Sequence, residues 1–132
     1  MRIRTLGLLA AAALTALALG ACSSKKSDEG NPVAPPTGPS FNLAFPSVGS
    51  SSSVTFPNAG TFGYHCTPHQ GSGMTGTVQV VSGSGVLADT VEVGPGGTLT
   101  FVPSTVTIAP GGSVRWVRPA GSSLNNHTAT SH

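Results

Sequence analysis

Charged side chains are scarce in this chain of 132 residues, which contains six Lys or Arg and four Asp or Glu residues. Two of the basic residues, Arg2 and Arg4, lie in an N-terminal segment that we expect to be removed. Without that segment, the chain has four basic and four acidic residues, so its formal charge is zero. The basic residues are Lys25, Lys26, Arg115 and Arg118, and the acidic residues are Asp28, Glu29, Asp89 and Glu92. Because nucleic-acid binding requires a basic surface, we expect no nucleic-acid partner.

Cysteine and methionine are also rare, at two residues each. Cys22 lies at the end of the N-terminal segment and Cys66 lies mid-chain, so a modification of Cys22 leaves no pair for an intramolecular disulfide. A single thiol in an oxidising compartment is protected when it is buried or bound to a metal. Cys66 therefore predicts either a buried, inert thiol or a metal thiolate.

The first 21 residues have the features of an export signal. They begin with Met1-Arg2-Ile3-Arg4, and residues 6–21 contain only apolar residues, Gly and one Thr. A run of this length fits a cleaved leader better than a membrane-spanning helix. Its end, Leu19-Gly20-Ala21-Cys22, resembles the bacterial lipobox, which implies that Cys22 is acylated and anchors the protein to the cell envelope, facing the periplasm or the cell surface. An ordinary secretory leader that contains a cysteine is the alternative.

The mature chain divides into a tether and one domain. Residues 22–40 are mostly small, charged or proline residues, and we expect a lipidated, disordered tether there. Residues 41–132 contain short runs of β-branched and aromatic residues between Gly, Pro, Asn and Ser, with no helical period, which predicts one all-β sandwich. The expected strands cover residues 53–56, 60–66, 76–81, 90–93, 98–102, 105–108, 113–117 and 127–131. We expect His132 to belong to a disordered tail.

Three potential metal ligands, Cys66, His69 and Met74, fall within nine residues. The strand ending at Cys66 delivers a thiolate, and a compact loop containing Gly and Pro folds His69 and Met74 back over it. A thiolate and an imidazole with a weak thioether form a soft site that favours copper, whereas structural zinc sites usually close with Cys or His ligands. His65 alternates away from Cys66 along the strand, so we expect it not to be a ligand.

The pattern Cys-x-x-His-x-x-x-x-Met over residues 66–74, followed by x-Gly-x-Val, resembles the copper loop of the plastocyanin family of cupredoxins. The resemblance implies a Greek-key β-sandwich of about seven to eight strands that holds one type 1 (blue) copper ion and carries single electrons, with the His69 ring as the exposed route. The chain departs from plant plastocyanins because His65 replaces a Tyr and acidic residues are almost absent. Its redox partners therefore cannot be inferred from the family.

The family has a second copper His upstream of the Cys, whereas no His precedes His65 here. Residues 91–127 resemble the beginning of a plastocyanin domain, and His127 follows on a turn rich in Gly, Ser and Asn, as the family's first copper His does. The resemblance therefore implies His127 as the fourth ligand and a circularly permuted order, in which residues 86–131 precede residues 41–81. We expect a monomer, although a domain-swapped dimer or a truncated tandem array would keep the same four ligands.

Three functions compete for such a site. The ligand set suits a single-electron carrier acting between redox proteins. A copper-carrying or copper-sequestering protein is the alternative, but such carriers usually have Met- and His-rich open sites, and Met74 is the only methionine besides Met1. Catalysis is disfavoured because four protein ligands leave no open position for a substrate, so we expect no enzyme activity.

Overall fold

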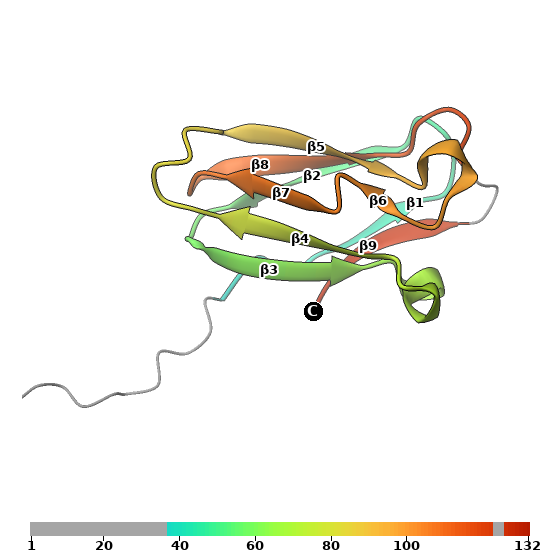
Figure 1. Cartoon of the computed structure of the whole chain (residues 1–132), viewed down its shortest axis with the longest axis horizontal. Helices are drawn as coiled ribbons and strands as arrows, with labels where there is room; N and C mark the ends of the chain where they lie inside the picture. The colour runs from blue at the N-terminus through green and yellow to red at the C-terminus, as the bar shows by residue number, and fades with distance from the viewer. Residues whose placement is uncertain (1–36, 123–125) are drawn as a thin grey trace, which may run out of the picture. The chain divides into compact units, whose positions relative to one another are not determined.

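Nine β-strands and two short 3-10 helices form the regular structure of the computed structural model, which describes residues 37–122 and 126–132 (Figure 1). The strands are β1 (Asn42–Phe45), β2 (Ser51–Phe56), β3 (Gly60–His65), β4 (Thr75–Val80), β5 (Ala88–Val93), β6 (Phe101–Val102), β7 (Thr105–Ile108), β8 (Gly112–Val117) and β9 (His127–Ser131). The 3-10 helix η1 (Thr67–Ser72) connects β3 to β4, and η2 (Pro95–Gly97) connects β5 to β6. Within these described ranges there is no α-helix.

The strands form two sheets that pack face to face. The five-stranded sheet has the order β1-β9-β3-β4-β7 and the four-stranded sheet has the order β2-β8-β5-β6. Most neighbouring strands are antiparallel, while β4 with β7 and β5 with β8 are parallel pairs. The predicted all-β sandwich is therefore confirmed.

β1 is the strand that the sequence pattern does not predict. Its four residues, Asn-Leu-Ala-Phe, are too few to show a clear alternation. The strand forms because it pairs with β9, from Asn42 opposite Thr130 to Phe45 opposite His127. The structure thus has nine strands instead of seven or eight, and β9 lies between two partners, β1 and β3.

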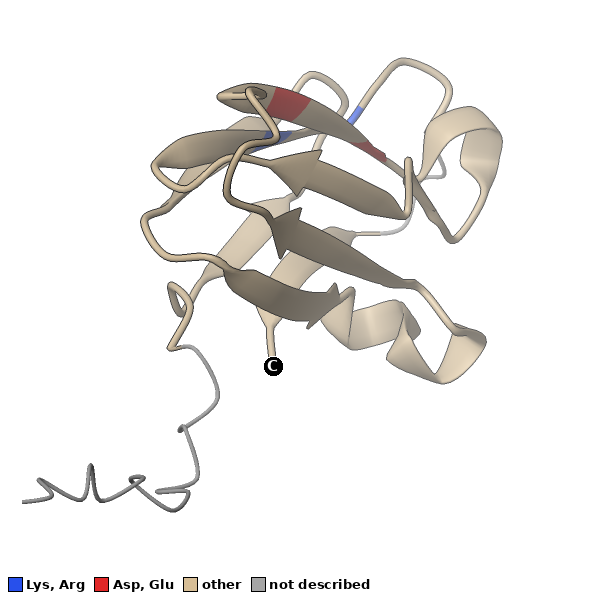
Figure 2. Ribbon diagram, turned by 60° about the vertical axis from the view of Figure 1, so that its left-hand side comes forward, with Lys and Arg blue, Asp and Glu red and all other residues tan. Residues whose placement is uncertain are grey.

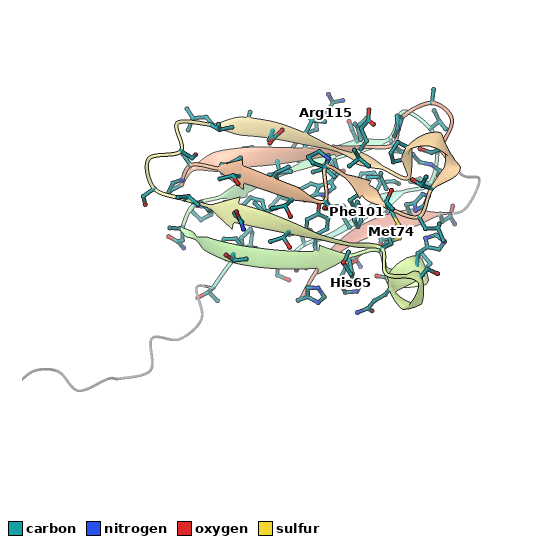
Figure 3. All side chains as sticks on the ribbon, viewed as in Figure 1. His65, Met74, Phe101 and Arg115 are labelled. Carbon is teal, nitrogen blue, oxygen red and sulfur yellow. The ribbon has the colours of Figure 1, made fainter. Side chains whose placement is uncertain are left out.

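Aromatic side chains fill the space between the sheets. Tyr64 of β3 and Trp116 of β8 are fully buried and meet edge to face, with ring centroids 5.2 Å apart. Phe101, which Figure 3 shows between the sheets, packs against Tyr64 at 4.8 Å. Burial raises the pKa of Tyr64 to about 12. The phenol therefore stays neutral at physiological pH and acts as core packing.

The few described charged residues lie on one side of the molecule. Asp89 and Glu92 belong to β5, Arg115 belongs to β8, and Arg118 directly follows β8 (Figure 2). The five-stranded sheet contains no Lys, Arg, Asp or Glu. Its outer face therefore presents hydroxyl, amide and imidazole groups, without fixed charge.

Several features expected from the N-terminal sequence concern residues outside the described ranges. The leader, the lipid attachment at Cys22 and most of the tether lie before residue 37. The last residues of the tether region are described, and Gly38 lies so close to the Phe62 ring that a Cβ there would clash with it. Among the described residues, no helix is long and apolar enough to span a bilayer.

The aromatic core makes a direct prediction about stability. Trp116→Ala removes a fully buried indole, and we expect it to lower the free energy of unfolding by about 3–5 kcal/mol. Leu87→Ala is the control, because Leu87 is 66% exposed and its loss should change stability by less than about 0.5 kcal/mol. Urea denaturation of the metal-free protein measures both values. A loss below about 1 kcal/mol for the Trp116 variant would contradict the described packing.

Candidate metal centre

Cys66 directly follows β3 and points into the sandwich. Side chains alternate along this segment, so Tyr64 and Cys66 are buried while His65 is on the outer face. Cys66 is the only described cysteine, and it forms no disulfide. Its side chain is fully buried, and a buried thiol has reactive or metal-binding character only when suitable groups surround it.

The loop after Cys66 is held by hydrogen bonds between the backbones of the predicted ligands. The amide of His69 donates to the carbonyl of Cys66 at 3.0 Å, and the amide of Met74 donates to the carbonyl of His69 at 3.3 Å. The amide of Cys66 in turn donates to the carbonyl of Met74 at 3.0 Å. This closed triangle, together with η1 and the left-handed Gly73 that ends it, fixes the relative positions of the three residues.

His127 is the first residue of β9 and reaches the same place from the other half of the chain. β9 pairs with β3 through Tyr64 opposite Ser131 and His65 opposite Thr130. The antiparallel register carries the start of β9 toward the end of β3, so that His127 and Cys66 meet although 61 residues separate them. His127 is only 1% exposed.

The potential donor atoms of Cys66, His69 and His127 lie within 4.8 Å of one another. The Cys66 Sγ is 3.3 Å from the His69 Nδ1 and 3.8 Å from the His127 Nδ1. The two imidazole rings are inclined at 50° with centroids 4.9 Å apart. Both histidines thus direct the same ring nitrogen toward the sulfur, as two ligands of one ion would.

Electrostatics favour a neutral His127. Burial lowers its pKa, and the neighbouring His69 and Arg118 lower it further. Arg118 is itself buried and donates a 2.7 Å hydrogen bond from its Nη1 to the carbonyl of Phe45, the residue paired with His127 across β1 and β9. A neutral imidazole has the free lone pair that metal binding requires.

Met74 completes the predicted set at the end of the sandwich where η1 returns to β4 (Figure 3). Its side chain is fully buried. The sulfur is therefore shielded from water, as suits a weak thioether ligand. Together, Cys66, His69, His127 and Met74 are arranged as a possible site for a single copper ion.

The donors fit copper better than zinc. One thiolate and two imidazoles, with a thioether available as a weak ligand, form the soft set typical of copper electron-transfer sites. The amide of Thr128 also donates to the Cys66 Sγ at 3.3 Å, and such a hydrogen bond stabilises a thiolate and tunes a metal bound to it. The donor atoms of this site therefore fit the copper ion that the Cys-x-x-His-x-x-x-x-Met pattern predicts.

His65 and His132 lie outside this cluster. His65 is on the outer face of the five-stranded sheet, as its alternation predicts. The expectation that His132 belongs to a disordered tail is wrong. Its amide donates to the carbonyl of Gly63 at 3.2 Å, and its ring packs against that of His65. Backbone pairing that continues one residue past β9 places it there.

Gly94 is a contributor that the sequence pattern does not reveal. It has φ +64°, and a Cβ there would lie 2.7 Å from the His127 Nε2. Gly94 therefore leaves the room that the imidazole occupies. The sequence marks residues 94–97 only as a turn, because nothing local indicates that a histidine far along the chain packs against it.

Gly94 generates a test with a matched control. Gly94→Ala should displace the His127 ring and weaken copper binding by about tenfold or more, the equivalent of roughly 1.4 kcal/mol. Gly96→Ala is the control, because Gly96 has φ +60° and a Cβ added there would meet nothing within 4 Å, so it adds similar backbone strain without touching the site. Competition titration with a Cu(I) chelator compares the two variants. Equal affinities would contradict the packing of His127 against Gly94.

Comparison with known proteins links part of the chain to a family of copper proteins. Residues 33–81 match the family of copper-binding proteins described as the plastocyanin/azurin family. The match covers fewer than half of the 132 residues, includes Cys66, His69 and Met74, and stops before His127. No curated protein and no solved structure matches the chain. The family match and the donor cluster together identify this site as a copper site.

Proposed function

We propose that the protein carries single electrons, using one copper ion held by Cys66, His69, His127 and Met74. The observation that supports this most strongly is the cluster of donor atoms from Cys66, His69 and His127, which lie within 4.8 Å of one another. Copper in such a site cycles between Cu(I) and Cu(II). Two further properties of the chain bear on the proposal: how firmly it holds these ligands, and which of them it exposes to solvent.

The chain holds its donors rigidly, which favours fast electron transfer. Cys66, His69 and Met74 are tied by their own backbone hydrogen bonds, and His127 is fixed by strand pairing on both sides of β9. A ligand set that cannot relax toward the geometry preferred by one oxidation state has little to rearrange when an electron arrives or leaves. Preorganisation of this kind reduces the cost of the reaction.

His69 supplies the route to solvent in this proposal. Cys66, Met74 and His127 are buried, whereas His69 is partly exposed. The surface around it has no described charged residue on η1 or on the five-stranded sheet. A partner redox protein would therefore dock there mainly through apolar and hydrogen-bonding contacts.

Copper carriage without electron transfer is the alternative. A carrier must release its ion, and an open site with mobile ligands serves that purpose. Here, three of the four side chains are buried and the loop is closed by backbone hydrogen bonds. This burial favours retention of the ion and argues against carriage. Four protein ligands also leave no open position for a substrate, so we propose no enzyme activity.

We further infer that the domain is circularly permuted. The family match ends at Val81, whereas the second imidazole comes from residue 127, after the segment that resembles the start of a plastocyanin domain. The turn with Gly83 and Gly85, both at positive φ, joins β4 to the strands that follow it. In the described chain, His127 meets Cys66 within one molecule, as a permuted monomer requires.

The electron-transfer proposal is tested by redox titration of the copper-loaded protein. We expect a reversible one-electron couple, with an intense visible band from thiolate-to-copper charge transfer in the oxidised form. Cys66→Ser should abolish that band, because a hydroxyl cannot replace the thiolate. A wild-type protein that holds only colourless Cu(I) and shows no reversible couple would support the carrier alternative.

The proposed lipid anchor and monomeric state can be tested with one variant. Cys22→Ser should move the protein from the membrane fraction to the soluble fraction, because the acylated residue is lost. The released protein should then elute from gel filtration at the mass of one chain. A Cys22 variant that remains in the membrane fraction would contradict the anchor, and elution at twice the chain mass would indicate a swapped dimer.

A further inference from the structure

A second pair of histidines lies on the outer face of the five-stranded sheet. The rings of His65, at the end of β3, and His132, just after β9, have centroids 4.8 Å apart and are inclined at 37°. The two rings of the copper site, His69 and His127, are 4.9 Å apart and inclined at 50°. The outer pair therefore has nearly the same ring separation as two imidazoles that are placed to share an ion.

The strand register explains why these rings meet. His65 is opposite Thr130 in the antiparallel β3–β9 pair, so His132 is its diagonal neighbour on the same face. Gly63 lies opposite His132, which donates its amide to the Gly63 carbonyl. A Cβ on Gly63 would lie 2.7 Å from the His132 Cδ2, so the missing side chain makes room for the ring.

The surroundings of the pair suit a metal cation. The Nδ1 of His65 is buried without a hydrogen-bond partner, which leaves Nε2 as its nitrogen for a ligand from solvent. No Lys or Arg on the five-stranded sheet opposes a positive ion. Neutral imidazole is the commonest protein ligand for ions such as Zn(II) and Cu(II).

We propose that His65 and His132 form a second metal site, which binds one Zn(II) or Cu(II) ion with water completing its coordination. This site is separate from the copper site, since His65 and Cys66 point to opposite faces of the sheet. The two sites are nevertheless joined by a single peptide bond. An ion on the outer face would thus place positive charge one residue from the copper thiolate.

The test uses the full chain loaded with one equivalent of copper and titrated with Zn(II). Calorimetry should give one further saturable site. In the reduced, diamagnetic Cu(I) protein, NMR should show the ring protons of His65 and His132 shifting with Zn(II), and in the oxidised protein the visible band of the copper site should persist. His65→Ala and His132→Ala should each weaken Zn(II) binding at least tenfold. The NMR shifts identify the histidines directly, so this result is separable from any failure of the electron-transfer proposal.

Two further variants test the paired geometry. Gly63→Ala keeps both imidazoles but pushes the His132 ring away, so Zn(II) binding should weaken severalfold. Thr75→Ala is the matched control, because Thr75 is the exposed residue opposite His65 on β4, and binding should be unchanged. Absence of a second saturable site in the wild-type chain would overturn the proposal. So would wild-type affinity in the His65, His132 or Gly63 variants.

Discussion

The antiparallel pairing of β9 with β3 is the constraint on which the rest of the site depends. It carries the Nδ1 of His127 to within 3.8 Å of the Cys66 Sγ, across 61 residues of chain. Without this pairing, Cys66, His69 and Met74 would form an incomplete set on one loop. The second imidazole converts that loop into a site with the donors that copper prefers.

Support for this meeting comes from elements that have no metal-binding group of their own. β1 pairs with the other edge of β9, Arg118 bonds to the Phe45 carbonyl behind His127, and Gly94 leaves space for the ring. The amide of Thr67 also donates to the Thr128 Oγ1 at 2.8 Å. Thr67 follows Cys66 and Thr128 follows His127, so this hydrogen bond connects the two segments that contain these ligands. The site is thus a product of the sandwich as a whole.

Much of the fold and the local half of the site can be predicted from sequence. The turns rich in Gly, Pro and Asn separate short β-branched runs, and this pattern identifies the strands from β2 to β9 within a few residues. Cys66, His69 and Met74 are recognisable because their spacing is local. β1 escapes prediction because four residues carry too little pattern, and it forms only through pairing with β9.

The long-range features need either a family resemblance or the structure. His127 can be inferred only because the family has a second histidine, and Gly94 has no sequence signal because its role depends on tertiary packing. His132 is easily mistaken for part of a disordered tail because terminal residues often are, whereas its backbone pairing with Gly63 orders it. Local sequence patterns therefore fail to predict residues whose role depends on contacts between strands far apart in the sequence.

X-ray absorption at the copper edge of the copper-loaded protein tests the central claim most directly, because it counts the atoms bound to the ion. We predict one short sulfur ligand and two imidazole nitrogens in the wild-type protein. In the His127→Ala variant, the protein should supply only one imidazole nitrogen. An unchanged count of imidazoles in that variant would contradict the meeting of His127 with Cys66.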